Sequence, residues 1–332
     1  MSVIRRLRRP AMLCIAAMTA ALLLGSCTLH RAEDSAIQRE NIDISLLLKR
    51  LDGDYWNSVV MGAEAASKEF DVTLHISAPE KLGSPEQQLE TVKLAMVHHP
   101  DAVVFAAGND EVIAGIVKAG GAARLPLVAI DTESDVGGIS SSITIDHYQA
   151  GRAAALKMVG LLAGKGSVAL LTDGSDDNNQ KRREAGIREV LAEESGITVI
   201  GSEPCLERYK DCRSVVSTLL NKQQVDGILA LNVQAAVAAA LEIKQQGLGG
   251  GKVKIIAFDS SMELLELLQE DQLQAVLVQN PFSIGYLGIK NAVLALRGEK
   301  VPPHVVMEIK LINGDNLFWP ENQRLLFPFI QK

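Results

Sequence analysis

Short apolar runs alternate with amphipathic segments along most of the chain. Nine nearly continuous apolar runs cover residues 42–48, 72–76, 102–106, 127–131, 167–171, 197–200, 227–231, 253–258 and 274–278. Apolar residues recur at helical spacing between them, over residues 56–69, 85–98, 147–162, 179–194, 233–246 and 284–296. Strands that are apolar at nearly every position are typical of parallel sheets covered by helices on both faces. The pattern therefore predicts an α/β fold.

This alternation continues for roughly 270 residues. One continuous sheet of that size would be unusually wide, so we predict two doubly wound parallel-sheet lobes. In such sheets, ligands bind in the crevice beyond the carboxyl ends of the strands. The residues that directly follow each strand are therefore the informative ones for function.

Polar or aromatic residues follow five of the predicted strands. They are Asp52, Asp54, Tyr55 and Trp56 after the first strand, and Asp131, Asn232, Asp259 and Gln279 after four later strands. Any single Asp or Asn in such a place is typical of a helix N-cap. Gln is not a preferred cap, however, and the repetition on successive strands favours a convergent polar site.

The N-terminal region differs from the rest of the chain. Four arginines between residues 5 and 9 precede an apolar run over residues 11–24. As a helix this run would rise only about 21 Å, which is short of the roughly 30 Å hydrocarbon core of a bilayer. It therefore predicts an export signal rather than a membrane span.

The apolar run ends in Leu-Gly-Ser-Cys at residues 24–27. This stretch resembles the bacterial lipobox, in which a cysteine is acylated and becomes the mature N-terminus. The resemblance implies a signal peptide over residues 1–26, a lipid on Cys27, and an anchor and tether over residues 27–41. The protein would then be held to the cell membrane, in the periplasm or on the outer face. The alternative is a plain secretory cleavage site with an incidental Cys27.

Charge and cysteine usage narrow the classes of function. The net charge is −7, and Lys and Arg are spread along the chain apart from the N-terminal cluster, so no nucleic-acid partner is expected. Outside the predicted signal peptide and lipid site, the remaining cysteines are Cys205 and Cys212. In an exported protein they are expected either to form a disulfide across a short loop or to remain two free thiols. No metal ligands or cofactor motif stand out. We predict a binding protein, although Asp131 and Asp259 could also imitate a glycosidase pair.

Seven segments in a fixed order resemble one family. They are DGDYWNSVVMGAEAA, PLVAIDTE, SITIDHYQAG, QKRREAGI, LALNVQAA, IIAFDSS and VLVQNPFSIGYLGI. Together they resemble the type I periplasmic sugar-binding proteins of the ribose-binding group, the extracellular receptors of ABC importers. The resemblance covers roughly residues 42–313.

The resemblance implies how the chain divides into lobes. A three-strand hinge would join an N-terminal lobe, residues 42–145 plus 281–308, to a C-terminal lobe, residues 146–280 plus 309–332. The tail over residues 317–332 is expected to pack along the hinge or a lobe surface, or to contact a partner.

The resemblance also implies roles for individual residues. Tyr55 and Trp56 would pack on the faces of a sugar ring, and the polar residues after the four later strands would bind its hydroxyls. Lys181 falls where the family has a ligand-binding arginine, whereas Arg183 is interpreted as structural. Thr132 replaces another family arginine. Because a Gly-Asp arrangement also replaces the family's first-loop asparagine, a different pentose, a hexose or another polyol fits as well as ribose.

These observations together predict an extracytoplasmic solute-binding lipoprotein with a monomeric body. It would capture a small sugar or polyol and deliver it to an ABC permease with its ATPase subunit. The alternative is a ligand-sensing subunit for a membrane sensor kinase or chemoreceptor, since both partners would recognise the same closure of the lobes.

Overall fold

The computed structural model describes residues 42–79, 84–134, 136–205 and 209–327. The predicted signal peptide, the predicted lipid attachment site Cys27 and the predicted tether lie outside the described residues. Within the described part of the chain, no helix is both long enough and apolar enough to span a bilayer.

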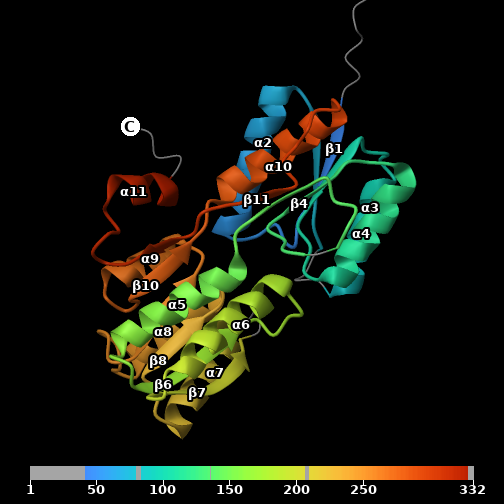
Figure 1. The fold of residues 1–332 in the computed structure, drawn as a ribbon. Coiled ribbons are helices and arrows are strands. Elements are labelled where there is room, and N and C mark those ends of the chain that lie inside the picture. Colours follow the sequence, from blue (N-terminus) through green and yellow to red (C-terminus); the bar gives the residue numbers. More distant parts are fainter. Residues whose placement is uncertain (1–41, 80–83, 135, 206–208, 328–332) are drawn as a thin grey trace, which may run out of the picture. The chain divides into compact units, whose positions relative to one another are not determined.

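Six parallel strands form the first sheet, in the order β11-β5-β4-β3-β1-β2. Their bounds are Asp43–Leu47 (β1), Thr73–Ser77 (β2), Ala102–Phe105 (β3), Leu127–Ile130 (β4), Ser141–Thr144 (β5) and His304–Val306 (β11). Helices α2 (Asp54–Phe70) and α10 (Pro281–Leu296) lie together on one side, and α3 (Pro85–Met96) and α4 (Asp110–Ala123) lie on the other (Figure 1). We call this sheet with its helices the N-lobe.

The second sheet also has six strands, in the order β12-β10-β9-β8-β6-β7. Their bounds are Gly166–Thr172 (β6), Ile197–Pro204 (β7), Gly227–Ala230 (β8), Lys254–Phe258 (β9), Ala275–Val278 (β10) and Lys310–Ile312 (β12). Helices α5 (His147–Leu161) and α6 (Asn178–Glu193) cover one face; α7 (Tyr209–Lys222), α8 (Val233–Gln245) and α9 (Met262–Gln269) cover the other. We call this sheet with its helices the C-lobe. The predicted fold of two doubly wound lobes is confirmed.

The packing explains why the strands are apolar at nearly every position. Side chains alternate between the two faces of a strand. In β8, Ile228 and Ala230 belong to the core under α7, α8 and α9, whereas Leu229 belongs to the core under α5 and α6. Both faces of the central strands are buried, so apolar residues occupy both sets of alternating positions.

The chain passes from the N-lobe sheet to the C-lobe sheet after β5, returns after β10, and passes again between β11 and β12. The nine predicted strands are all present. The strands β5, β11 and β12 were not predicted. Three of the four residues of β5 are Ser or Thr, and the three residues of β11 and of β12 are too few to show a period. The edge strand β12 also runs antiparallel to β10, so the second sheet is not purely parallel.

The C-terminal tail packs on the C-lobe. Leu317 is buried in the core under α7, α8 and α9. The short helix α11 (Pro320–Leu326) follows, and its last two leucines pack partly buried against the same core. Residues 328–332 lie outside the described part of the chain.

Glycines let two pairs of helices approach through their backbones. A methyl group at Gly62 of α2 or Gly285 of α10 would overlap a carbonyl oxygen of the opposite helix. Gly151 of α5 and Gly186 of α6 stand in the same relation in the C-lobe. Each lobe therefore has one helix pair that tolerates no side chain at its crossing point.

We predict that Gly285→Ala lowers the free energy of unfolding by about 2 kcal/mol, because the added methyl group overpacks the α2–α10 contact. Gly121→Ala in α4 is the matched control, since its added Cβ meets no atom within 4 Å. That change should instead stabilise the protein by about 0.5–1 kcal/mol. Urea unfolding of both variants measures the difference, and equal effects would contradict the close packing.

Candidate functional site

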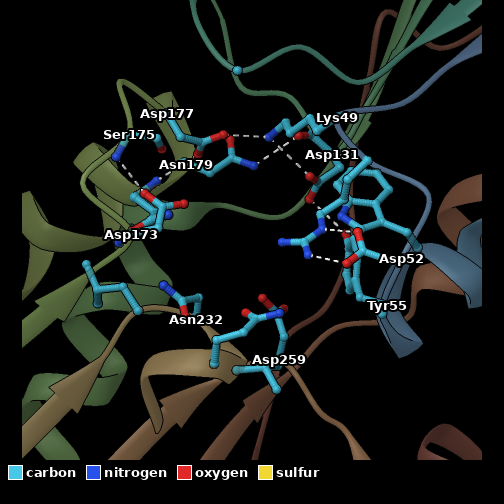
Figure 2. Close-up of a pocket in the computed structure, with 18 of the residues that line it drawn as sticks. Lys49, Asp52, Tyr55, Asp131, Asp173, Ser175, Asp177, Asn179, Asn232 and Asp259 are labelled. Carbon is cyan, nitrogen blue, oxygen red and sulfur yellow. Dashed lines mark hydrogen bonds and ion pairs between the residues drawn. The ribbon is translucent and has the colours of Figure 1, made fainter. Parts of the chain in front are cut away.

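A cavity of about 550 Å³ lies between the two lobes, at the carboxyl ends of their strands (Figure 2). We call it the main cavity. From the N-lobe its lining includes Lys49, Tyr55, Trp56, Asn109 and Asp131, and from the C-lobe it includes Asp177, Asn179, Arg183, Asn232 and Asp259. Parallel strands all end at the same edge of a sheet, so loops far apart in sequence meet here.

Two carboxylates occupy equivalent places in the two lobes. Asp131 follows β4 and Asp259 follows β9, and both have left-handed backbones, with φ of 45° and 65°. Each donates its backbone N–H to the neighbouring strand, to the oxygen of Ile143 at 3.0 Å and of Leu277 at 2.9 Å. Asp is among the few residues that visit this conformation readily. The turn thus directs one carboxylate from each sheet into the cavity.

Asp131 is held by three side chains from both lobes. The Tyr55 hydroxyl donates to its Oδ1 at 2.7 Å, and Lys49 Nζ lies 3.3 Å from its Oδ2. Lys49 also donates to Asp177 Oδ2 of the C-lobe at 2.9 Å. Asn179 Nδ2 donates to the Asp131 backbone oxygen at 2.9 Å. Lys49 therefore bridges carboxylates of opposite lobes (Figure 2).

Burial shifts the protonation equilibria of this cluster. Burial lowers the pKa of Lys49, but the Asp177 and Asp131 carboxylates outweigh it and raise that pKa above 10.5. Burial raises the pKa of Asp131, and the Lys49 charge only partly opposes this. Burial and the nearby Asp131 and Asp259 charges raise the pKa of Tyr55 well above 10. Lys49 is thus charged at neutral pH, and Tyr55 remains a hydrogen-bond donor.

Asp259 has its own set of partners in the C-lobe. Gln279 Nε2 donates to its Oδ1 at 2.6 Å, and Arg183 Nη1 lies 3.4 Å from its Oδ2. The same guanidinium donates to the Leu231 backbone oxygen at 3.0 Å, and its Nε donates to His147 Nδ1 at 3.2 Å. These contacts hold the Arg183 guanidinium in place and put its positive charge at the wall of the cavity.

Two buried polar atoms of the cavity lining lack a hydrogen-bond partner within the described structure. They are Asn179 Oδ1, an acceptor, and Asn232 Nδ2, a donor. A buried polar group without a partner costs roughly 1–3 kcal/mol. A bound hydroxyl group, which both donates and accepts, could pair with either atom.

The two aromatic rings lie side by side at the first turn of α2. Tyr55 and Trp56 meet edge to face, with ring centroids 5.1 Å apart and planes at 84°. Trp56 is only 8% exposed and belongs to the core, yet both rings line the cavity. They supply an apolar surface next to the Asp131 carboxylate.

The structure corrects the predicted place of one cation. The Lys181 side chain is 55% exposed, pairs with Asp176, and does not line the main cavity. Arg183, interpreted from sequence as structural, does line it. Residues two apart on a helix point about 200° apart, so the two side chains cannot share a face. Arg183 therefore replaces Lys181 as the cavity's cation on α6.

Two other predicted site residues also lie elsewhere. Thr132 is buried, and its hydroxyl accepts from the Ala107 N–H at 2.9 Å and donates to the Ile130 oxygen at 2.9 Å. It stabilises the backbone after β4 and does not line the main cavity. Gln279 lines a smaller neighbouring cavity and reaches the main one through Asp259.

The two acidic residues of the first loop line the main cavity but have protein partners. Asp52 forms an ion pair with Arg50, and its side chain is 74% exposed. Asp54 Oδ2 accepts the backbone N–H of Met262 at 3.2 Å, which links the first loop to the start of α9.

Several residues that line the cavity were missed from sequence. Lys49 stands two residues after β1 and Asn109 four residues after β3, so both could have been predicted from their place after a strand. Asn109 Nδ2 donates across the cleft to Asp176 Oδ2 at 3.0 Å. Asp177 caps α6 by accepting from the Gln180 N–H, and Asn179 lies in its first turn. An Asp at the start of a helix is typical of a cap, and nothing in the sequence shows that Asp177 also contacts Lys49.

Cys205 and Cys212 are joined by a disulfide, and Cys205 lines the main cavity. Residues 206–208 of the enclosed loop lie outside the described structure. Among the residues that are described, no cluster of three His, Cys, Asp or Glu side chains could hold a metal ion.

Comparison with known proteins gives consistent results. Residues 44–300 match the family described as periplasmic binding protein domain. The ribose import binding protein RbsB of Haemophilus influenzae is 23% identical over 300 residues, covering 90% of this chain and 99% of that protein. The D-allose-binding periplasmic protein of Escherichia coli is 23% identical over 282 residues, covering 82% and 90%.

Solved structures share the fold. The glucose-galactose binding protein GanP from Geobacillus stearothermophilus has a TM-score of 0.79 and 26% identity, covering 84% of this chain and all of that one. An ABC transporter solute binding protein from Agrobacterium vitis, solved with bound D-fucose, has a TM-score of 0.81 and 23% identity, covering 86% and 99%.

The buried His147 makes stability depend on pH. Burial first, and then the Arg183 and Lys49 charges, hold its pKa well below 6.5. Its Nδ1 accepts from Arg183, so the neutral ring carries its proton on Nε2, 3.4 Å from Thr144 Oγ1. Below pH 6.5 the unfolded chain binds a proton at this residue and the folded chain does not.

We therefore predict that the free energy of unfolding falls on acidification below pH 6.5, by up to about 1.4 kcal/mol per pH unit from this group. Urea unfolding between pH 7.5 and 5 measures the slope. His147→Asn removes the titrating group and should flatten the curve, whatever its effect on absolute stability. An unchanged slope in that variant would contradict the assignment.

Proposed function

Because this chain belongs to the family of periplasmic binding protein domains, we propose that it captures a small sugar or polyol and delivers it to an ABC permease. The observation that carries the proposal is the convergence of polar groups from both lobes on one cavity beside two aromatic rings. Its relatives are named as sugar-binding or sugar-import proteins, not as enzymes.

The charge of the cavity indicates a neutral ligand. Its lining includes eight carboxylates and three cationic side chains, so its net charge is negative. An acidic or phosphorylated sugar would be repelled. Carboxylates accept strong hydrogen bonds from hydroxyl groups, and aromatic faces cover the apolar C–H surface of a sugar ring. Asp131, Asp259, Tyr55 and Trp56 provide both kinds of contact.

The two lobes offer a mechanism for capture. A ligand in the main cavity could contact Asp131 of the N-lobe and Asn232 of the C-lobe at once. A closed arrangement that makes more contacts with the ligand than an open one becomes more populated when the ligand binds. Direct bonds between the lobes, such as Lys49 to Asp177 and Asn109 to Asp176, add to that closure.

Sugar binding is testable by thermal unfolding against D-ribose, D-allose, D-arabinose, D-fucose, D-tagatose, D-galactose and D-glucose. A ligand at 100 times its Kd should add about 2.7 kcal/mol to the free energy of unfolding. No shift with any monosaccharide or polyol would overturn the proposal, and turnover of the bound sugar would indicate an enzyme.

Two variants test whether the main cavity is where this ligand binds. Asp259→Asn keeps the shape and the left-handed backbone but removes the charge, so affinity should fall at least tenfold. Lys181→Ala is the control, because that side chain lies outside the cavity lining, and it should keep full affinity. Weaker binding by Lys181→Ala would support the ligand contact assigned to Lys181 from sequence, and full affinity of Asp259→Asn would place the ligand elsewhere.

We also propose that Cys27 carries a lipid that holds the protein outside the cytoplasmic membrane. The support is the position of Leu-Gly-Ser-Cys directly after the apolar run. Cys27→Ser should abolish incorporation of labelled palmitate and prevent recovery of the mature protein in the membrane fraction. Recovery of labelled, membrane-bound Cys27→Ser protein would exclude this anchor.

A further inference from the structure

A second cavity of about 270 Å³ adjoins the main cavity. We call it the side cavity. Six residues line both cavities and form the wall between them: Asp54, Tyr55, Asp259, Ser260, Ser261 and Met262. Asp54 Oδ2 accepts the Met262 N–H at 3.2 Å within this wall, which adds a further contact between the two lobes. The two cavities are therefore parts of one cleft.

The side cavity differs from the main cavity in its chemistry. Met61 of α2 lies on the N-lobe side, and Leu265 of α9 with Leu325 and Leu326 of α11 lies on the C-lobe side. Residues 54, 57, 58 and 61 of α2 share one helical face, so a continuous stripe of that helix borders it. All the charged residues of its lining belong to the shared wall. Beyond the wall the lining is uncharged, and five apolar residues outnumber the three polar ones, Asn57, Ser58 and Gln279.

Two methionine side chains that line the side cavity are exposed to solvent. Met61 is 42% exposed and Met262 is 56% exposed, and they come from opposite lobes. Single exposed apolar residues are common, but two that line the same cavity together with three leucines indicate a binding surface. Methionine side chains are flexible and polarizable, which suits them to apolar groups of varied shape.

The inner end of the side cavity carries one unsatisfied acceptor. Gln279 is buried and donates its Nε2 to Asp259, while its Oε1 has no partner among the described residues. A ligand that extends from the main cavity therefore meets polar groups first and apolar side chains beyond them. That order matches a sugar that carries an apolar substituent.

We propose that the side cavity binds an apolar substituent of the sugar, so that alkyl or aryl glycosides bind more tightly than the free monosaccharide. The inference rests on the proposed sugar-binding function. At about 30 Å³ for each water-sized group, the cavity has room for about nine such groups, which accommodates a phenyl ring or a short alkyl chain.

The test compares free sugars with their glycosides on the whole protein. Titration calorimetry would measure Kd for D-ribose, D-allose, D-arabinose, D-fucose, D-galactose and D-glucose, and for their methyl, butyl and phenyl glycosides in both anomeric forms. Each buried methylene should tighten binding up to about fourfold. For at least one sugar, the butyl and phenyl glycosides should bind at least tenfold more tightly than the methyl glycoside.

Met61 provides a matched pair of variants for the same measurement. Met61→Gln removes the apolar surface at nearly constant length and should reduce the ratio of methyl-glycoside Kd to phenyl-glycoside Kd. Met61→Leu keeps an apolar side chain and should retain that ratio. Because Met61 is exposed on a helix, neither variant threatens folding.

The possible results separate the two proposals. Binding of a free sugar with equal or weaker binding of its butyl and phenyl glycosides overturns the side-cavity assignment and leaves the proposed function standing. The same ratio in Met61→Gln as in the unmodified protein also overturns the assignment. Failure of every sugar and every glycoside to bind overturns both.

Discussion

The bridge from Lys49 to Asp131 and Asp177 is the interaction on which the site depends. An ammonium group with little access to water loses hydration energy, and it stays charged only because two carboxylates face it. One of these carboxylates belongs to each lobe, so the same contact that keeps the cation charged also joins the lobes. Two of the many carboxylates of the main cavity are thereby partly neutralised.

The two lobes solve the same structural problem in the same way. Each places an aspartate with a left-handed backbone at the end of a central strand, and each anchors that aspartate by a backbone bond to the next strand. Each also packs one pair of helices through glycines. The result is a cleft with one fixed carboxylate on either side, and ligand specificity is left to the side chains between them.

Residue periodicity predicted most of the fold because it follows directly from burial. A strand covered on both faces has apolar side chains at both odd and even positions. In β8, Ile228 and Leu229 are neighbours that face opposite cores. The short strands β11 and β12 carry no such signal. They form where the chain crosses between the lobes, because there it comes to lie beside β5 and β10. Helices α4, α7, α9 and α11 were also not among the predicted segments. In α4, three glycines weaken the helical pattern of the sequence.

The sequence by itself determined the two-lobed α/β class and the placement of Tyr55, Trp56, Asp131, Asn232 and Asp259 at strand ends. These follow from local patterns and from the rule that parallel strands end together. Only the tertiary structure decided that Arg183 and not Lys181 faces the main cavity, because the orientation of α6 selects which of its faces is buried. Only the tertiary structure paired Lys49 with Asp177, since 128 residues separate them and no local pattern records such a contact.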